Sequence, residues 1–162
     1  MQLQQPTTEQ LLQVMQWVRS PKVFDIWAGP DFRFPFTEES FIEDLKLDEL
    51  HSRALVAPEL EHNNQVQAFG QVYQRLNRTH LGRLIVNPQA QGKGIGTQLI
   101  KSLMALGDSL FGCDSYSLFV LHSNTRAKEL YQRLGFVIAE YPEIMPLADC
   151  YYMVQSKGLS NE

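Results

Sequence analysis

The chain has 162 residues, of which 44% are hydrophobic and 20% are charged, and this balance predicts one globular domain and argues against disorder. Its net charge of −4 argues against broad nucleic-acid binding, because no basic excess exists to neutralise a phosphate backbone, and weakly favours a cationic substrate. No apolar run approaches the length of a membrane span, and the first residues carry no secretory signal. Cys113 and Cys150 lack metal-ligand spacing. We therefore expect a cytoplasmic protein with reduced thiols, no bound metal and no membrane partner.

The first 50 residues contain two predicted helices separated by an aromatic segment. A short strand is expected at 1–5, and an amphipathic helix is expected from about Thr8 to Ser20. A second helix is predicted to begin at Thr37, which acts as its cap. Between the helices, residues 23–36 show neither strand nor helix periodicity, so we interpret them as an aromatic loop interrupted by prolines. Such a loop fits the lining of a substrate cleft and a buried connector equally well.

Three consecutive antiparallel strands are predicted next. They cover residues 53–60, 66–76 and 79–86, and the polar residues 61–64 form the turn between the first two. A glycine-rich segment follows, and an amphipathic helix opens from it and is expected to end at Gly107, as a left-handed cap.

The last third of the chain predicts one more helix between strands. A strand is expected at 116–121, and Ser123 or Asn124 caps a helix that Gly135 stops. Strands at 136–141 and 150–154 close the chain. Together these elements predict one α/β domain with a mixed sheet.

The stretch 83–106 combines a strand, an Asn-Pro turn, alternating glycines and a helix N-terminus. Free backbone N–H groups and the helix dipole suit a phosphate at such a place. A P-loop needs Ser or Thr after Gly-Lys, but Gly92-Lys93 is followed by Gly94. A dinucleotide fold needs G-x-G-x-x-G directly after the first strand of a parallel unit, whereas this chain has G-x-G-x-G after three antiparallel strands. Both alternatives fit poorly in detail.

Two motifs resemble the GNAT superfamily of N-acetyltransferases. Residues 91–96, QGKGIG, fit the family pattern Gln/Arg-x-x-Gly-x-Gly/Ala, and residues 124–136 resemble its pattern N-x-x-A-x-x-L-Y-x-x-x-G-F. Both motifs stand in the family's order on the expected elements. The resemblance implies a mixed, mostly antiparallel sheet of about six to seven strands with helices on both faces. It also implies a splay between the strands at 79–86 and 115–121.

The resemblance further implies acetyl-CoA as the cofactor, with CoA as a product. The family holds the pyrophosphate on backbone amides of the glycine segment, and it pairs the pantetheine arm with the edge of the preceding strand, where an N–H near Val86 polarises the thioester carbonyl. Lys93 is either a phosphate contact or a solvated lysine, and Asn124 is expected to contact the arm, to cap its helix, or to do both. The implied cofactor-binding residues are Leu84, Ile85, Val86, Gln91, Gly92, Lys93, Gly94, Ile95, Gly96, Thr97, Asn124 and Tyr131.

The catalytic side chains implied by the resemblance are fewer. Tyr131 matches the family tyrosine that protonates the leaving CoA thiolate, although its ring could instead be only a core group. Many family members carry a glutamate on the strand before the glycine motif, and this sequence has none there. His80 is therefore our candidate general base, His122 is the second, and a water chain is the alternative.

The acceptor is expected to be a primary amine of a small molecule or a peptide. By elimination, we assign its recognition to the aromatic segment, where Trp27, Phe32 and Phe34 could form an apolar or cation–π wall and Asp25 or Asp31 could pair with an ammonium group. A catalytically inactive CoA-binding sensor and a nucleotide-binding protein are the competing functions. Both a monomer and a homodimer are compatible with the sequence.

Overall fold

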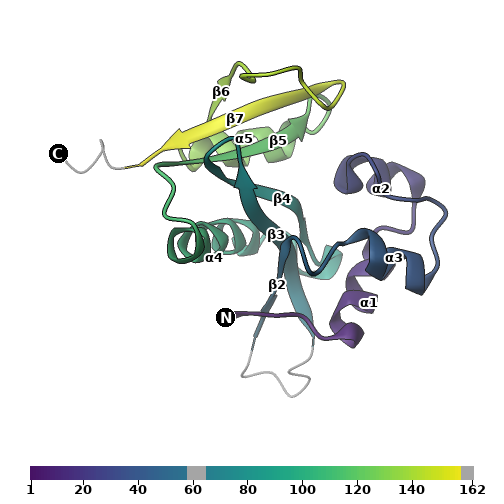
Figure 1. Cartoon of the computed structure of the whole chain (residues 1–162). Helices are drawn as coiled ribbons and strands as arrows, with labels where there is room; N and C mark the ends of the chain where they lie inside the picture. The colour runs from purple at the N-terminus through teal and green to yellow at the C-terminus, as the bar shows by residue number, and fades with distance from the viewer. Residues whose placement is uncertain (58–64, 158–162) are drawn as a thin grey trace.

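The computed structural model describes residues 1–57 and 65–157, and its arrangement is shown in Figure 1. Within these residues the helices are α1 (Thr8–Trp17), α2 (Pro21–Ala28), α3 (Glu38–Asp44), α4 (Ile95–Leu110) and α5 (Thr125–Arg133), with a 3₁₀ turn at Pro88–Ala90. The strands are β1 (Gln2–Gln4), β2 (His51–Val56), β3 (Val66–Arg75), β4 (Arg78–Val86), β5 (Ser115–Leu121), β6 (Val137–Ala139) and β7 (Cys150–Ser156). The predicted turn at 61–64 lies outside the described residues. No helix in the described ranges is long and apolar enough to cross a membrane.

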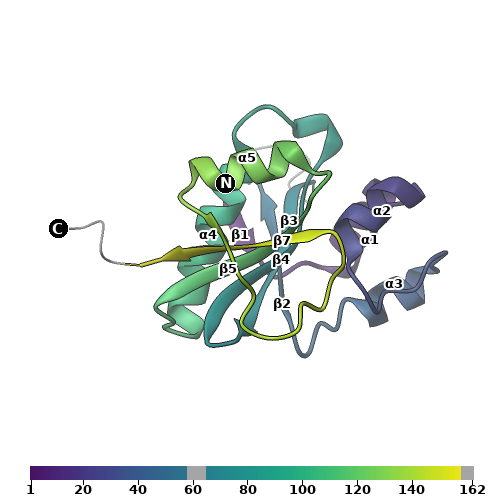
Figure 2. The same cartoon turned by 90° about the horizontal axis from the view of Figure 1, so that it is seen from above.

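The strands form a single open sheet in the order β1-β2-β3-β4-β5-β7-β6. The β4–β5 pair is parallel, and the other neighbouring strands in the described sheet are antiparallel. Figures 1 and 2 show α4 on one face of this sheet and α1, α2 and α3 on the other. The predicted mixed, mostly antiparallel sheet with helices on both faces is therefore confirmed.

Each face of the sheet has its own hydrophobic core. On one face, Leu99 and Leu103 of α4 pack with Leu81 and Leu118 of the central strands. On the other face, side chains of α1, α2 and α3 pack against β2 and β3, and Phe41 of α3 is fully buried there. The two apolar faces explain why the sheet lies between two helical layers.

The sheet splays open between β4 and β5. The parallel pairing joins Thr79, His80 and Leu81 to 116–118, and in the described sheet residues 82–86 have no partner on β5. A bulge accompanies the opening, because the β3–β4 register shifts between Phe69 and Gln71. Arg83, at the bulge, has a left-handed φ of 48°. The implied splay is thus present, and the β-strand edge it exposes faces a cleft.

Residues 21–28 form a helix, so the interpretation of 23–36 as a loop was wrong for that part. Ser20 is the N-cap, where its side chain accepts a hydrogen bond from the N–H of Val23, and Pro21 occupies the first turn. Phe24, Trp27 and Ala28 are buried at helical spacing. The helix forms because this apolar face packs on the core, although the stretch is too short for strong periodicity.

Gly107 does not end its helix, and the prediction that it does was wrong. It lies inside α4, which continues to Leu110, and Gly112 follows the helix with a φ of 64°. A Cβ at Gly107 would collide with the side-chain methyl of Thr79 on β4. The glycine therefore allows α4 to approach the sheet closely.

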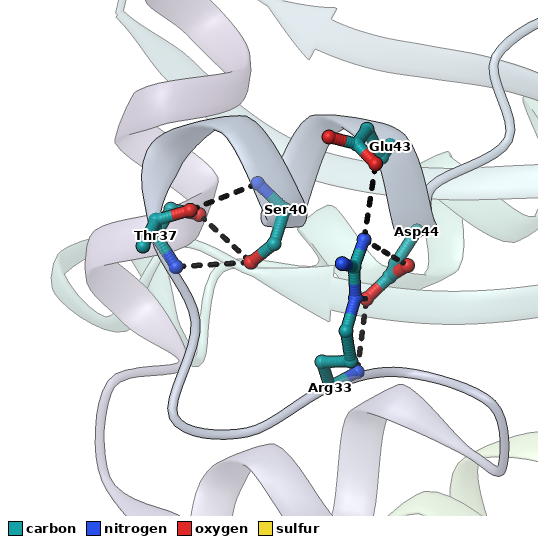
Figure 3. A network of polar contacts seen from close by, with 5 residues as sticks. All are labelled: Arg33, Thr37, Ser40, Glu43 and Asp44. Carbon is teal, nitrogen blue, oxygen red and sulfur yellow. Dashed lines mark hydrogen bonds and ion pairs between the residues drawn. The ribbon is translucent and has the colours of Figure 1, made fainter.

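The helix α3 begins at the predicted cap. The Thr37 hydroxyl accepts from the Ser40 N–H at 3.0 Å, and the Ser40 hydroxyl accepts from the Thr37 N–H at 2.9 Å (Figure 3). At the other end of the helix, Arg33 donates to Asp44 and Glu43 (Figure 3). These contacts attach the segment between α2 and α3 to the last turn of α3.

Candidate active site

A cleft of about 1040 Å³ opens where β4 and β5 separate. Its walls come from both splayed strands, the glycine segment, the first turns of α4, helix α5 and helix α2. Elements far apart in the sequence therefore meet at one cavity, and the two sheet faces contribute different parts of it. One end is formed by the glycine segment and the other by α2.

The glycine segment presents backbone groups to the cleft. Gly94 is the N-cap residue of α4 in a left-handed conformation, and no side-chain cap bonds to this helix within the described residues. The space beside Gly92 and Gly94 is open, because a Cβ added at either residue would have no atom of the described residues within 4 Å outside its own chain neighbours. The first N–H groups of a 16-residue helix are thus left for a ligand, which favours an anion.

All but one of the predicted cofactor-binding residues line this cleft. The exception is Lys93, which is exposed and lies outside the lining. Asn124 stands at the N-cap position of α5 without a side-chain cap bond, so its side chain is available to the cleft. The backbone of Leu84, Ile85 and Val86 lines the cleft on the strand edge that β5 leaves unpaired.

Tyr131 lies on α5 and lines the cleft from a buried position. Its ring meets Phe136 edge to face, with centroids 6.3 Å apart. Burial raises the pKa of the Tyr131 hydroxyl to about 12, because the phenolate would lose its solvation. The hydroxyl is therefore protonated at neutral pH and has a proton to donate.

His80 lies at the vertex of the splay and also lines the cleft. Its Nδ1 is 2.8 Å from the hydroxyl oxygen of Ser117, and its ring packs against Phe119 and Tyr73. Burial, and to a lesser degree the charge of Arg75, lowers the pKa of His80 to about 3. Its imidazole is therefore neutral at pH 7. The second candidate, His122, is exposed, packs against another ring and lies outside the lining.

The predicted acceptor residues divide into two groups. Asp25, Trp27 and Asp31 line the cleft, and the two aspartates are exposed. Phe32 and Phe34 are not part of the lining, because Phe32 is buried in the core and the exposed Phe34 packs against the rings of Phe24 and Phe36. The aromatic segment thus supplies both cleft wall and core.

Trp27 has a specific polar contact in addition to its packing. Its indole N–H donates to the backbone carbonyl of Arg83 at 2.8 Å. Its ring stacks on the ring of Phe41, with the two centroids 5.8 Å apart. The indole therefore supports the bulge in β4 from the α2 side. Trp27 joins the cleft wall to the strand that borders it.

Sequence reasoning missed two arginine side chains of the cleft. Arg83 and Arg75 both line the cleft, and Gln71 of β3 accepts a hydrogen bond from Arg83. The available signal was the charged residue in the otherwise apolar run LGRLIV, because an arginine in a central strand needs a buried acceptor.

With this geometry described, comparison with known proteins gives the family. Residues 21–136 match the model of the acetyltransferase (GNAT) family. The chain belongs to this family. The match contains α2, the three antiparallel strands, the glycine segment and α5 with Tyr131. Most residues that line the cleft therefore lie within the matched range, and Trp17, Pro146, Leu147, Ala148 and Cys150 lie outside it.

Individual relatives are more distant. The chain is 36% identical to a spermine/spermidine N(1)-acetyltransferase of Bacillus subtilis over 59 residues, which cover 36% of this chain and 39% of that protein. Among solved structures, a PaiA N-acetyltransferase from Thermoplasma acidophilum in complex with coenzyme A has a TM-score of 0.71 at 16% identity, covering 96% of this chain and 98% of that one. The ribosomal-protein-S18-alanine N-acetyltransferase of Escherichia coli has a TM-score of 0.64 at 22% identity, covering 96% of this chain and 92% of that one. At these identities the structural likeness establishes the GNAT fold.

Proposed function

We propose that this protein transfers the acetyl group of acetyl-CoA to a primary amine of a small molecule or a peptide. The observation that carries the proposal is the joint position of the glycine segment, the unpaired β4 edge and Tyr131 around one cleft. Family membership and the relative solved with coenzyme A support the choice of cofactor. The two unpaired cysteines fit a reducing compartment, so we propose a cytoplasmic location.

In the proposed complex, the backbone of the glycine segment binds the pyrophosphate. Fixed N–H groups at a helix N-terminus suit this task, because they lose no side-chain entropy and need no counter-charge. Thr97, in the first turn of α4, adds its hydroxyl. The pantetheine arm pairs with the edge of residues 84–86, and an N–H near Val86 polarises the thioester carbonyl.

The acceptor amine attacks the thioester carbonyl directly, and the C–N bond forms as the C–S bond breaks. Tyr131, which its raised pKa keeps protonated at neutral pH, donates its proton to the departing thiolate and regains one from water after the reaction. We propose His80 as the first acceptor of the proton released by the amine. Because a charged imidazole is unfavourable at this buried site, the proton passes on to water.

The test is a direct assay for the released thiol. The protein is incubated with acetyl-CoA and a panel of amines, and free CoA thiol is measured against time. Amine-dependent thiol release is the expected result. An inactive CoA-binding sensor would instead show thermal stabilisation by CoA without thiol release for any amine. A nucleotide-binding protein would be stabilised by ATP rather than by CoA.

A further inference from the structure

Arg83 is held in one orientation at the α2 end of the cleft. Its Nε donates to the carbonyl of Ala28 at 2.9 Å, and its Nη1 donates to Oε1 of Gln71 at 2.8 Å. The guanidinium also lies over the ring of Phe32, 5.1 Å from the centroid. Contacts from α2, from β3 and from the segment that follows α2 thus define where the charge lies.

The glutamine that holds Arg83 is itself fixed. Gln71 is fully buried, and its Nε2 donates to the carbonyl of Leu45 at 2.8 Å and to the hydroxyl of Ser52 at 2.9 Å. Both amide hydrogens are used, so the amide oxygen has to face Arg83. The guanidinium is therefore oriented before any ligand arrives, which lowers the entropy lost when a ligand binds.

No anion in the described chain neutralises this guanidinium by direct contact. Its hydrogen-bond partners are an amide and a carbonyl, and within residues 1–57 and 65–157 it forms no ion pair. Asp31 and Asp44 act on it only at a distance, and Asp44 is bound by Arg33 instead (Figure 3). A guanidinium has five N–H donors, and these bonds use two. A partly buried cation with donors to spare favours an anionic ligand.

The position of Arg83 assigns this ligand to the acceptor rather than to the cofactor. Arg83 packs with Ala28 and Phe32 on the α2 face of the sheet, whereas its neighbour Leu84 packs on the α4 face. The glycine segment that is suited to phosphates belongs to α4. The exposed carboxylates of Asp25 and Asp31 at the cleft are screened by solvent more than the partly buried guanidinium.

We propose that Arg83 determines acceptor specificity by binding a carboxylate of the acceptor, so that amino-carboxylates such as free amino acids are preferred over polyamines. Guanidinium and carboxylate match in a planar pair of parallel hydrogen bonds. This inference rests on the acetyltransferase function proposed above. It changes the weak expectation, from net charge, of a cationic substrate to one of an amine that also carries a carboxylate.

The experiment compares acceptors that differ only at the carboxylate. Thiol release from acetyl-CoA is measured for free amino acids, for the corresponding amino-acid amides, and for spermidine. The readout is the ratio of kcat/KM for each acid to that for its amide. We expect the acid to be preferred, and Arg83→Gln to lower that ratio about 30-fold, as for a lost charge-assisted hydrogen bond.

Two further variants make the test specific. Arg83→Lys keeps the charge but loses the planar fork, so we expect a ratio between those of the wild type and Arg83→Gln. Arg19→Gln removes an exposed arginine that lies outside the cleft lining, and it should leave the ratio unchanged. Thermal stabilisation by CoA is measured for each variant, so that a folding defect is recognised separately.

The outcomes separate this inference from the function on which it rests. A wild type that prefers spermidine or the amides overturns the inference and leaves the acetyltransferase function standing, as does an unchanged ratio in Arg83→Gln. If no amine releases thiol, the proposed function fails. Calorimetry then decides the inference: binding of the acid but not the amide to the CoA-loaded protein, lost in Arg83→Gln, supports it, and equal or no binding overturns it.

Discussion

The two ends of the cleft differ in whether backbone groups or side chains are available to a ligand. At the α4 end, the groups suited to a ligand are backbone N–H groups of the glycine segment and the unpaired edge of β4. At the α2 end, they are side chains held by other side chains, as Gln71 holds Arg83. The first end uses residues close together in the sequence, whereas the second joins residues up to 56 positions apart, as in the bond from Trp27 to Arg83.

This difference has a consequence for specificity. A backbone site is determined by conformation, so one short motif reproduces it and many sequences bind the same cofactor. A side-chain site changes with each substitution, so related chains can select different acceptors on one fold. Changes at the α4 end should therefore alter CoA binding, and changes at the α2 end should alter the acceptor dependence.

The largest effect is expected at Tyr131, which lines the cleft from α5. Tyr131→Phe should lower kcat about 100-fold, because the proton donor to the thiolate is lost. The Kd for CoA, measured by calorimetry, should stay near the wild-type value. Tyr116→Phe is the matched control, since that hydroxyl bonds to Asp108 outside the cleft. Equal turnover in Tyr131→Phe and wild type would remove Tyr131 as the general acid.

The next effect concerns His80 and pH. The folded state keeps the pKa of His80 near 3, below its ordinary 6.5, so the unfolded chain binds more protons as the pH falls. Stability is therefore fully present above pH 6.5 and is lost toward pH 3, by up to about 1.4 kcal/mol per pH unit from this group. Denaturant unfolding at several pH values gives the free energy of unfolding as a function of pH. The slope of this dependence should be smaller in His80→Gln than in the wild type. The exposed His122→Gln should keep the wild-type slope, and equal slopes in all three proteins would contradict the assignment.

A change at Gly94 tests the backbone end. Gly94→Ala adds a Cβ in open space at a positive φ of 76°, so it strains the helix start and intrudes on the ligand space. We expect the Kd for CoA to rise about tenfold, which corresponds to about 1.4 kcal/mol. Gly112→Ala adds the same kind of strain outside the cleft, at φ 64°, and should leave the Kd unchanged. A similar Kd for both variants would mean that the glycine segment does not bind the cofactor.

The smallest effect is expected at Trp27, at the side-chain end. Trp27→Phe keeps an aromatic ring but removes the N–H that bonds to the Arg83 carbonyl, so stability should fall by about 1 kcal/mol. The KM for the acceptor should rise while the Kd for CoA does not. A rise in the CoA Kd without a change in the acceptor KM would break the division between the two ends.

The sequence alone determined the glycine segment at the α4 end and most of the element order. The glycine spacing, the Asn-Pro turn and the caps at Thr37 and Gly135 are local signals, because each depends on the conformation of a few neighbouring residues. The alternation of strands and helices likewise follows from local periodicity. The local signals at 91–96 thus predicted an anion site, and the resemblance of 91–96 and 124–136 to the GNAT superfamily implied CoA.

Only the tertiary structure decided the arrangement of the α2 end. Helix α2 forms because its short apolar face finds a core, and Gly107 lies inside its helix because α4 packs against Thr79. The charge environment of Arg83 depends on Ala28, Phe32 and Gln71, which are distant in sequence or lie on other elements. Burial and electrostatic pairing are properties of the packed chain. The sequence therefore shows which charged and apolar side chains are present, but it does not show which side chains they contact.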